Sequence, residues 1–174
     1  MATDVNAIIR EDIVKVSDAL TRPSNTTAYT AGDVISEVTS NEHFAFDGIA
    51  AAGSRSGTIV SAICQSSTVE STKPDLELWL FDSNIANVAD NSAFAVADSD
   101  LLDLVGVIDF PIAEWKQGLA GASGTGNSIN QSHNLNIRYI ADSGNRIYGQ
   151  LVVRNAYTPI SAEVFTVILL TAQD

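Results

Sequence analysis

The stretch Leu76-Glu-Leu-Trp-Leu-Phe81 decides the fold class, because a leucine stands at every second position. Successive side chains of a strand point to opposite faces, so the three leucines share one face. The glutamate, the tryptophan and the phenylalanine share the other. The alternation predicts a β-strand over residues 76–81.

Short strand patterns of the same kind recur on both sides of this stretch. Residues 164–170 are apolar on both faces except Thr166, which predicts a central strand. The other predicted strands are 13–20, 34–38, 43–46, 57–64, 105–110, 134–141, 146–154 and, around the central run, 161–171.

The connections carry turn residues or long polar segments. Residues 82–98 are rich in Asn, Asp and Ala, which predicts a long crossing loop with at most one helical turn. The acidic residues at 98–100 precede a short helix or 3₁₀ turn over 101–105, with an aspartate as its N-cap. The four glycines within residues 118–132 predict a loop. The short Asp-Ser-Gly-Asn connection at 142–145 suits a hairpin.

The number and spacing of these strands indicate the architecture. About eight to ten short strands without a long amphipathic helix predict an all-β fold, an antiparallel β-sandwich that is jelly-roll-like. An immunoglobulin-like sandwich is the second choice. The chain has 174 residues, which suits one domain. We expect this sandwich domain to span residues 13–174, preceded by an extended N-terminal arm at residues 1–12.

The charge balance excludes one class of partner. The chain has 9 basic and 21 acidic residues, a net charge of −12, and therefore repels phosphate backbones. Nucleic acid is not an expected partner. Charged residues make up 17% of the chain, against about 25% in an average soluble domain, which is typical of a surface partly covered by a partner.

Neither a targeting segment nor a membrane span is predicted. The N-terminus has no basic segment followed by a long apolar one, and no apolar run approaches the roughly 20 residues of a membrane span. We therefore expect a soluble protein that is made in the cytoplasm and has no membrane partner.

Motifs that carry chemistry are incomplete. Residues 121–128 resemble a phosphate loop but have Asn127 where the motif needs lysine, so no nucleotide cofactor is expected. His43 and His133 are the two histidines, and Glu42, the neighbour of His43, points to the opposite face of a strand. No Gly-x-Ser-x-Gly elbow and no metal-ligand spacing of histidines occurs. We predict no catalytic, cofactor-binding or metal-binding residues, and no enzyme.

Two further features have both a chemical and a structural interpretation. Seven carboxylates and no Lys or Arg lie between Asp82 and Glu114, at 82, 90, 98, 100, 103, 109 and 114. Calcium could use those near residues 98–100, but a solvated acidic face is favoured, and the sequence leaves open paired carboxylates for glycoside hydrolysis. Cys64, the single cysteine, is expected to be buried and inert.

Several stretches together resemble a known class of proteins, the virion structural proteins of tailed bacteriophages. They cover 55 of the 174 residues and include no catalytic motif. The stretches are Val-Ser-Asp-Ala-Leu-Thr-Arg-Pro-Ser-Asn-Thr-Thr-Ala-Tyr-Thr-Ala-Gly-Asp-Val-Ile at 16–35, Leu-Glu-Leu-Trp-Leu-Phe-Asp at 76–82, Ala-Asp-Asn-Ser-Ala-Phe at 89–94, Asp-Leu-Val-Gly-Val-Ile at 103–108, Arg-Asn-Ala-Tyr-Thr-Pro-Ile-Ser-Ala-Glu-Val-Phe-Thr-Val at 154–167 and the final Gln-Asp.

The resemblance implies a head decoration (capsid cement) protein, made in the bacterial host cytoplasm and bound to the outer surface of the capsid. Its implied partners are the major capsid protein and further copies of itself, as a homotrimer. A different virion part, a tail or receptor-binding module that recognises a host-surface glycan, is the alternative.

Overall fold

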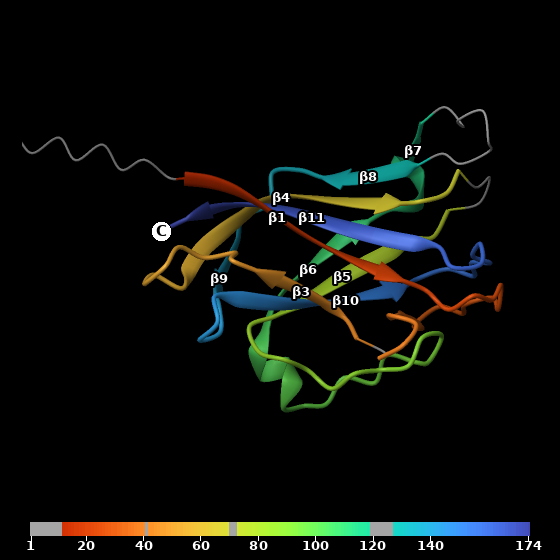
Figure 1. Cartoon of the computed structure of the whole chain (residues 1–174), viewed down its shortest axis with the longest axis horizontal. Coiled ribbons are helices and arrows are strands. Elements are labelled where there is room, and N and C mark those ends of the chain that lie inside the picture. Colours follow the sequence, from red (N-terminus) through yellow and green to blue (C-terminus); the bar gives the residue numbers. More distant parts are fainter. Residues whose placement is uncertain (1–11, 41, 70–72, 119–126) are drawn as a thin grey trace, which may run out of the picture.

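The chain folds into two antiparallel β-sheets packed face to face (Figure 1), as a computed structural model shows for residues 12–40, 42–69, 73–118 and 127–174. The strands are β1 (Asp12–Thr21), β2 (Val34–Ile35), β3 (Phe44–Asp47), β4 (Ser56–Ser66), β5 (Leu76–Phe81), β6 (Leu104–Phe110), β7 (Lys116–Gln117), β8 (Ser128–Ser132), β9 (Ile137–Ile140), β10 (Arg146–Val153) and β11 (Val164–Gln173). Two 3₁₀ turns, η1 (Asp100–Asp103) and η2 (Ile112–Glu114), flank β6.

The six-stranded sheet has the order β1-β11-β4-β8-β7, with β9 also paired to β4. β11 lies between β1 and β4, so the prediction of a central strand is confirmed. Its inward side chains Phe165, Val167 and Leu169 are fully buried. Its other face is apolar as predicted, but those side chains are only half-buried.

The five-stranded sheet has the order β2-β10-β5-β6, with β3 also paired to β10. β5 covers the predicted residues, and Leu76, Leu78 and Leu80 are buried on one face, as the alternation predicts. They meet the inward side chains of the six-stranded sheet in one core. The all-β sandwich is therefore confirmed, while the jelly-roll topology stays a prediction.

Residues 128–132 correct the loop predicted over 118–132, because they form β8 beside β4. The hydrophobicity pattern of this strand is the reverse of the usual one, so the sequence does not predict it. Ser128 and Asn130 are buried, and Ile129 is exposed. Two bonds make the inversion possible. The Ser128 hydroxyl donates to the carbonyl oxygen of Thr68 at 2.8 Å, and the Asn130 amide donates to that of Pro111 at 2.7 Å. Residues 119–126 of the predicted loop lie outside the described residues.

The connection at 142–145 is a corner between the sheets and not a β-hairpin, so that prediction is wrong. β9 pairs with β4 in one sheet and β10 belongs to the other. The carboxylate of Asp142 accepts hydrogen bonds from the backbone N–H groups of Gly144 at 2.8 Å and Arg146 at 3.0 Å, and Asn145 adopts a φ of 58°. These contacts turn the chain sharply enough to change sheets.

The 3₁₀ turn predicted near residue 101 is present as η1, but its N-cap is Ser99 rather than an aspartate, without a side-chain capping bond. Residues 82–98 contain no helical turn. Residues 1–11 lie outside the described residues, and β1 already begins at Asp12, so the arm at residues 1–12 stays a prediction. No helix among the described residues is long and apolar enough to cross a membrane.

Candidate interaction surface

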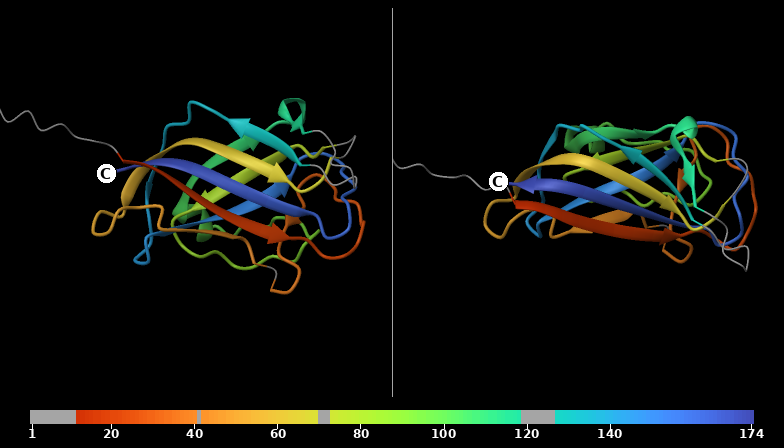
Figure 2. Two further views of the ribbon diagram at one scale, coloured as in Figure 1. Left: turned by 45° about the horizontal axis from the view of Figure 1, so that its top comes forward. Right: turned by 90° about the horizontal axis from the view of Figure 1, so that it is seen from above.

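The outward face of the six-stranded sheet carries no covering layer among the described residues, and Figure 2 shows its strands unobstructed. We call the outward side chains of β1, β11, β4 and β8 the open face. They are Ile13, Lys15, Ser17, Ala19, Ser61, Ile63, Gln65, Ile129, Gln131, Val164, Thr166, Ile168 and Leu170.

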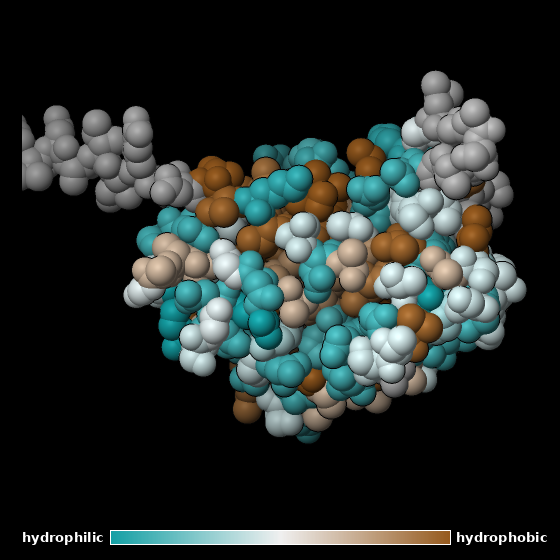
Figure 3. Space-filling model, viewed as in Figure 1, coloured by the Kyte–Doolittle hydropathy of each residue, from teal (hydrophilic) through white to brown (hydrophobic). Residues whose placement is uncertain are grey.

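The strand registers place apolar and polar members of this face side by side. Lys15 lies opposite Leu170, Ile168 pairs with Ile63, and Gln65 pairs with Ile129. Figure 3 shows hydrophobic residues among hydrophilic ones over this part of the molecule. Ile13 is 58% exposed, a position that a partner surface would cover at a gain in free energy.

The charge on the open face differs from that of the whole chain. The chain carries −12, yet Lys15 is the only charged member of the face and no carboxylate belongs to it. Lys15 forms no ion pair within the described part of the chain. A surface depleted of charge is typical of the centre of a protein interface.

The five-stranded sheet is different, because its outward face is covered. Gln150 and Val152 point outward from β10 beside β5 and are nevertheless fully buried. Residues 82–98 run along this sheet, and Phe94 packs edge-on against Trp79 with 5.4 Å between the ring centroids. The chain therefore leaves one sheet face open and covers much of the other.

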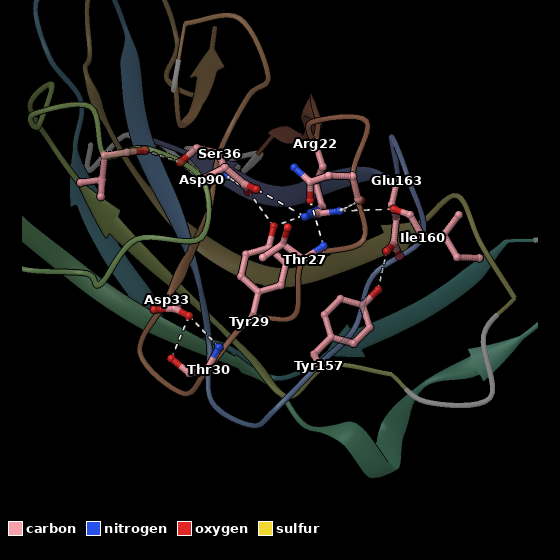
Figure 4. Close-up of polar contacts among 12 residues, drawn as sticks. Arg22, Thr27, Tyr29, Thr30, Asp33, Ser36, Asp90, Tyr157, Ile160 and Glu163 are labelled. Atoms are coloured by element: carbon pink, nitrogen blue, oxygen red, sulfur yellow. Dashed lines mark hydrogen bonds and ion pairs between the residues drawn. The ribbon is translucent and has the colours of Figure 1, made fainter.

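A buried polar cluster fixes the covering segment in place (Figure 4). The guanidinium of Arg22, fully buried, forms an ion pair with Asp90 at 3.4 Å and donates a hydrogen bond to the Tyr29 hydroxyl. Tyr29 donates to Asp90 at 2.6 Å, and the backbone N–H of Ser36 donates to the same carboxylate at 3.1 Å. Burial, with the adjacent Asp90 carboxylate, raises the pKa of Tyr29. These groups hold the loops at one end of the sandwich rigidly.

A second buried polar cluster lies at the same end of the sandwich as the first. The carboxylate of Glu163 accepts hydrogen bonds from Ser66 at 2.5 Å, from Thr68 at 3.0 Å and from Tyr157. The ammonium of Lys73 donates to the hydroxyl of Thr68 at 3.1 Å and to that of Ser66 at 3.3 Å. The ammonium also donates to the backbone oxygen of Thr68 at 2.9 Å, and the cluster ties together the ends of β4 and β11.

The cysteine and the two histidines considered above as candidate catalytic residues do not form a common site. Cys64 is buried, and burial raises the pKa of its thiol, as expected for an inert cysteine. His43 is buried beside β3 and burial lowers its pKa, whereas Glu42 is exposed. His133 is exposed and follows β8, in the other sheet.

The acidic stretch forms a solvated face only in part. Asp98, Asp109 and Glu114 are exposed, but the Asp90 side chain is 6% exposed and pairs with Arg22. Burial, with the nearby Asp103, raises the pKa of Asp82. Among the described residues, no three carboxylate, histidine or cysteine side chains form a group that could hold a metal ion.

Comparison with known protein families and with curated proteins gives no match. Among solved structures, the capsid of Ralstonia phage GP4 is similar with a TM-score of 0.36 and 14% identity, over 94% of this chain and 85% of that chain. The structure of Triatoma virus is similar with a TM-score of 0.25 and 11% identity, over 92% of this chain and 63% of that chain. Likenesses this distant assign no role to the present chain.

Proposed function

We propose that this chain is a structural virion protein rather than an enzyme: a decoration protein that binds the outer surface of a tailed-phage capsid as a homotrimer. One observation supports assembly above all others. A chain with a net charge of −12 leaves the outward side of four strands open, and no carboxylate lies among the outward side chains of these strands. The resemblance of 55 of the 174 residues to phage virion proteins supports a place in a phage particle.

The negative net charge of the chain supports a location on the outer surface of the capsid. Packaged duplex DNA carries about one negative charge per 1.7 Å of its length. A trimer of this chain carries three times −12 and would be repelled from the inner surface. The same charge keeps unattached copies soluble on the outside.

The free edge of β1 supports a contact with the shell. β1 is ten residues long, and β11 is its only strand partner in the described part of the chain. A long edge strand offers unpaired backbone groups to a strand of another chain. The segment before β1 adjoins this strand in the sequence, and we propose that both contribute to attachment.

A deletion tests this proposal. Residues 2–11 are removed, with Asp12 kept because it opens β1, and the variant is mixed with shells that lack the protein. We expect full-length protein to sediment with the shells and the deletion variant to bind at least about tenfold more weakly, while both unfold at the same temperature. Equal binding of the two proteins would contradict the proposed role of the N-terminal segment in attachment. Failure of the full-length chain to bind shells would contradict the proposed decoration function.

The glycan-binding alternative is less well supported, because every aromatic ring of the chain is buried or half-buried. Sites that recognise sugars usually stack them on exposed aromatic rings, and here the exposed large apolar side chains are all aliphatic among the described residues. Binding of the purified protein to host-surface polysaccharide, with none to shells, would favour the alternative.

A further inference from the structure

The turn before β6 presents an apolar side chain to solvent. We call residues 98–103, which include η1, the acidic turn. Leu102 is 87% exposed, the highest value of any large apolar side chain among the described residues, and Leu101 beside it is 40% exposed. A leucine displayed on a short, backbone-bonded turn is suited to insertion into another surface.

The charged side chains of the acidic turn itself are all negative. Asp98 is exposed and Asp100 is half-exposed, while Asp103 accepts a hydrogen bond from Ser83. No lysine or arginine occurs anywhere between residues 82 and 114. A surface that receives the acidic turn must therefore combine apolar contact with positive charge.

The open face has both properties. Ile63, Ile168 and Leu170 form an apolar surface on adjacent strands, and Lys15 lies directly opposite Leu170 in the β1–β11 register. The acidic turn lies away from this face on the same molecule, at the bottom of Figure 1, so one copy cannot bring its own two surfaces together.

We propose that the acidic turn of one copy docks on the open face of a second copy, with Leu102 against Ile168 and its neighbours and Asp98 and Asp100 near Lys15. Because two different surfaces meet, the contact is heterologous and propagates head to tail. A ring of three such contacts closes the homotrimer. This inference rests on the trimeric state in the proposed function and not on attachment to a shell.

Charge favours this occupant over symmetric pairing of two open faces. Two open faces packed together would meet without a carboxylate for either Lys15, whereas the acidic turn supplies two.

Mass measurement by light scattering over a range of concentrations tests the contact. Full-length protein should have three times the monomer mass of 18.4 kDa at micromolar concentration. Leu102→Ser, at a solvent-exposed site where folding is unaffected, should weaken association at least about thirtyfold. Ile160→Ser is the matched control, since Ile160 is 46% exposed and belongs to neither surface, and it should leave the mass unchanged.

A charge exchange then identifies the partner surface. Lys15→Glu should weaken association at least about tenfold, and adding Asp100→Lys to it should restore at least part of the loss, because the pair has been reversed. A monomeric full-length protein, a trimer unaffected by Leu102→Ser, or a charge exchange without recovery would each overturn the inference. So would an Ile168→Asp variant that remains trimeric but no longer binds shells, since the open face would then contact the shell.

The inference and the proposed function fail separately. Trimers that dissociate on Leu102→Ser but never bind shells would support the contact and contradict the decoration role. Monomers that decorate shells would support attachment to the shell and contradict both the contact and the trimeric state.

Discussion

Arg22 and Asp90 lie 68 residues apart in the chain and form a buried ion pair, with 3.4 Å between Nη2 and Oδ2. Arg22 directly follows β1 of the six-stranded sheet. Asp90 belongs to the segment that runs along the five-stranded sheet, where the N–H of Ser36 also donates to it. The pair therefore connects the end of one sheet to the covering of the other.

Breaking this pair should destabilise the fold strongly. Asp90→Asn leaves the fully buried guanidinium of Arg22 without a counter-charge, and removal of one partner of a buried pair costs about 3–5 kcal/mol. Urea unfolding of the variant measures the loss. Asp98→Asn, at an exposed position, should change the free energy of unfolding by less than about 0.5 kcal/mol. Equal stability of the two variants would show that the pair does not anchor the covering segment.

A methyl group at Gly57 should also destabilise the protein. A Cβ atom built there would lie 2.6 Å from the backbone oxygen of Ala172 on β11, a contact that only a backbone shift relieves. We expect Gly57→Ala to lower the free energy of unfolding by about 1–3 kcal/mol. Ser17→Ala, on the exposed side of β1, is the control and should be nearly neutral. A neutral Gly57→Ala would contradict the close packing of β4 against β11.

The Cys64 thiol should be unreactive in the folded protein. It is fully buried and its pKa is raised by burial, so neither access nor thiolate is available. Iodoacetamide at pH 8 should leave native protein unmodified and label one thiol per chain in denaturant, as mass spectrometry can measure. Rapid labelling of native protein would place the residue outside the core.

Glu37 should titrate at unusually low pH. Hydrogen bonds from Thr39, and then from Ser40, lower the pKa of its carboxyl to about 2 from an ordinary 4.5. A lowered pKa stabilises the fold above the unfolded value, so this contribution is present above about pH 4.5 and is lost as the pH falls towards 2. Carboxyl NMR titration measures the shift directly. Thr39→Val removes the hydroxyl donor but keeps the backbone N–H donor, so it should raise the pKa part of the way, and Ser40→Ala should raise it less.

Local patterns predicted most of the sandwich, because its strands alternate in the ordinary sense. β5 and the central β11 combine an apolar inward face with runs of strand-forming residues. β8 was not predicted, because its buried positions are the polar residues Ser128 and Asn130. Their burial is favourable only because they donate to the backbone oxygens of Thr68 and Pro111, which are distant in the sequence. The corner at 142–145 was predicted as a hairpin, because turn-forming residues do not show whether the two strands they join belong to the same sheet.

The candidate surface was less visible in the sequence than the fold. The low share of charged residues predicted a covered surface, but not its position. Lys15 and Leu170 stand 155 positions apart in the chain and meet only through the β1–β11 register. The burial of Asp90 in an ion pair could not be predicted either, because its partner Arg22 lies far outside the acidic stretch that contains Asp90.

Localisation on intact, genome-filled particles tests the central claim most directly. Particles are imaged by cryo-electron microscopy with and without an antibody fragment raised against the folded protein. We predict trimeric density at regular positions on the outer capsid surface, labelled by the fragment without disruption of the particle. Density at the tail, or labelling only after the heads are opened, would contradict the account.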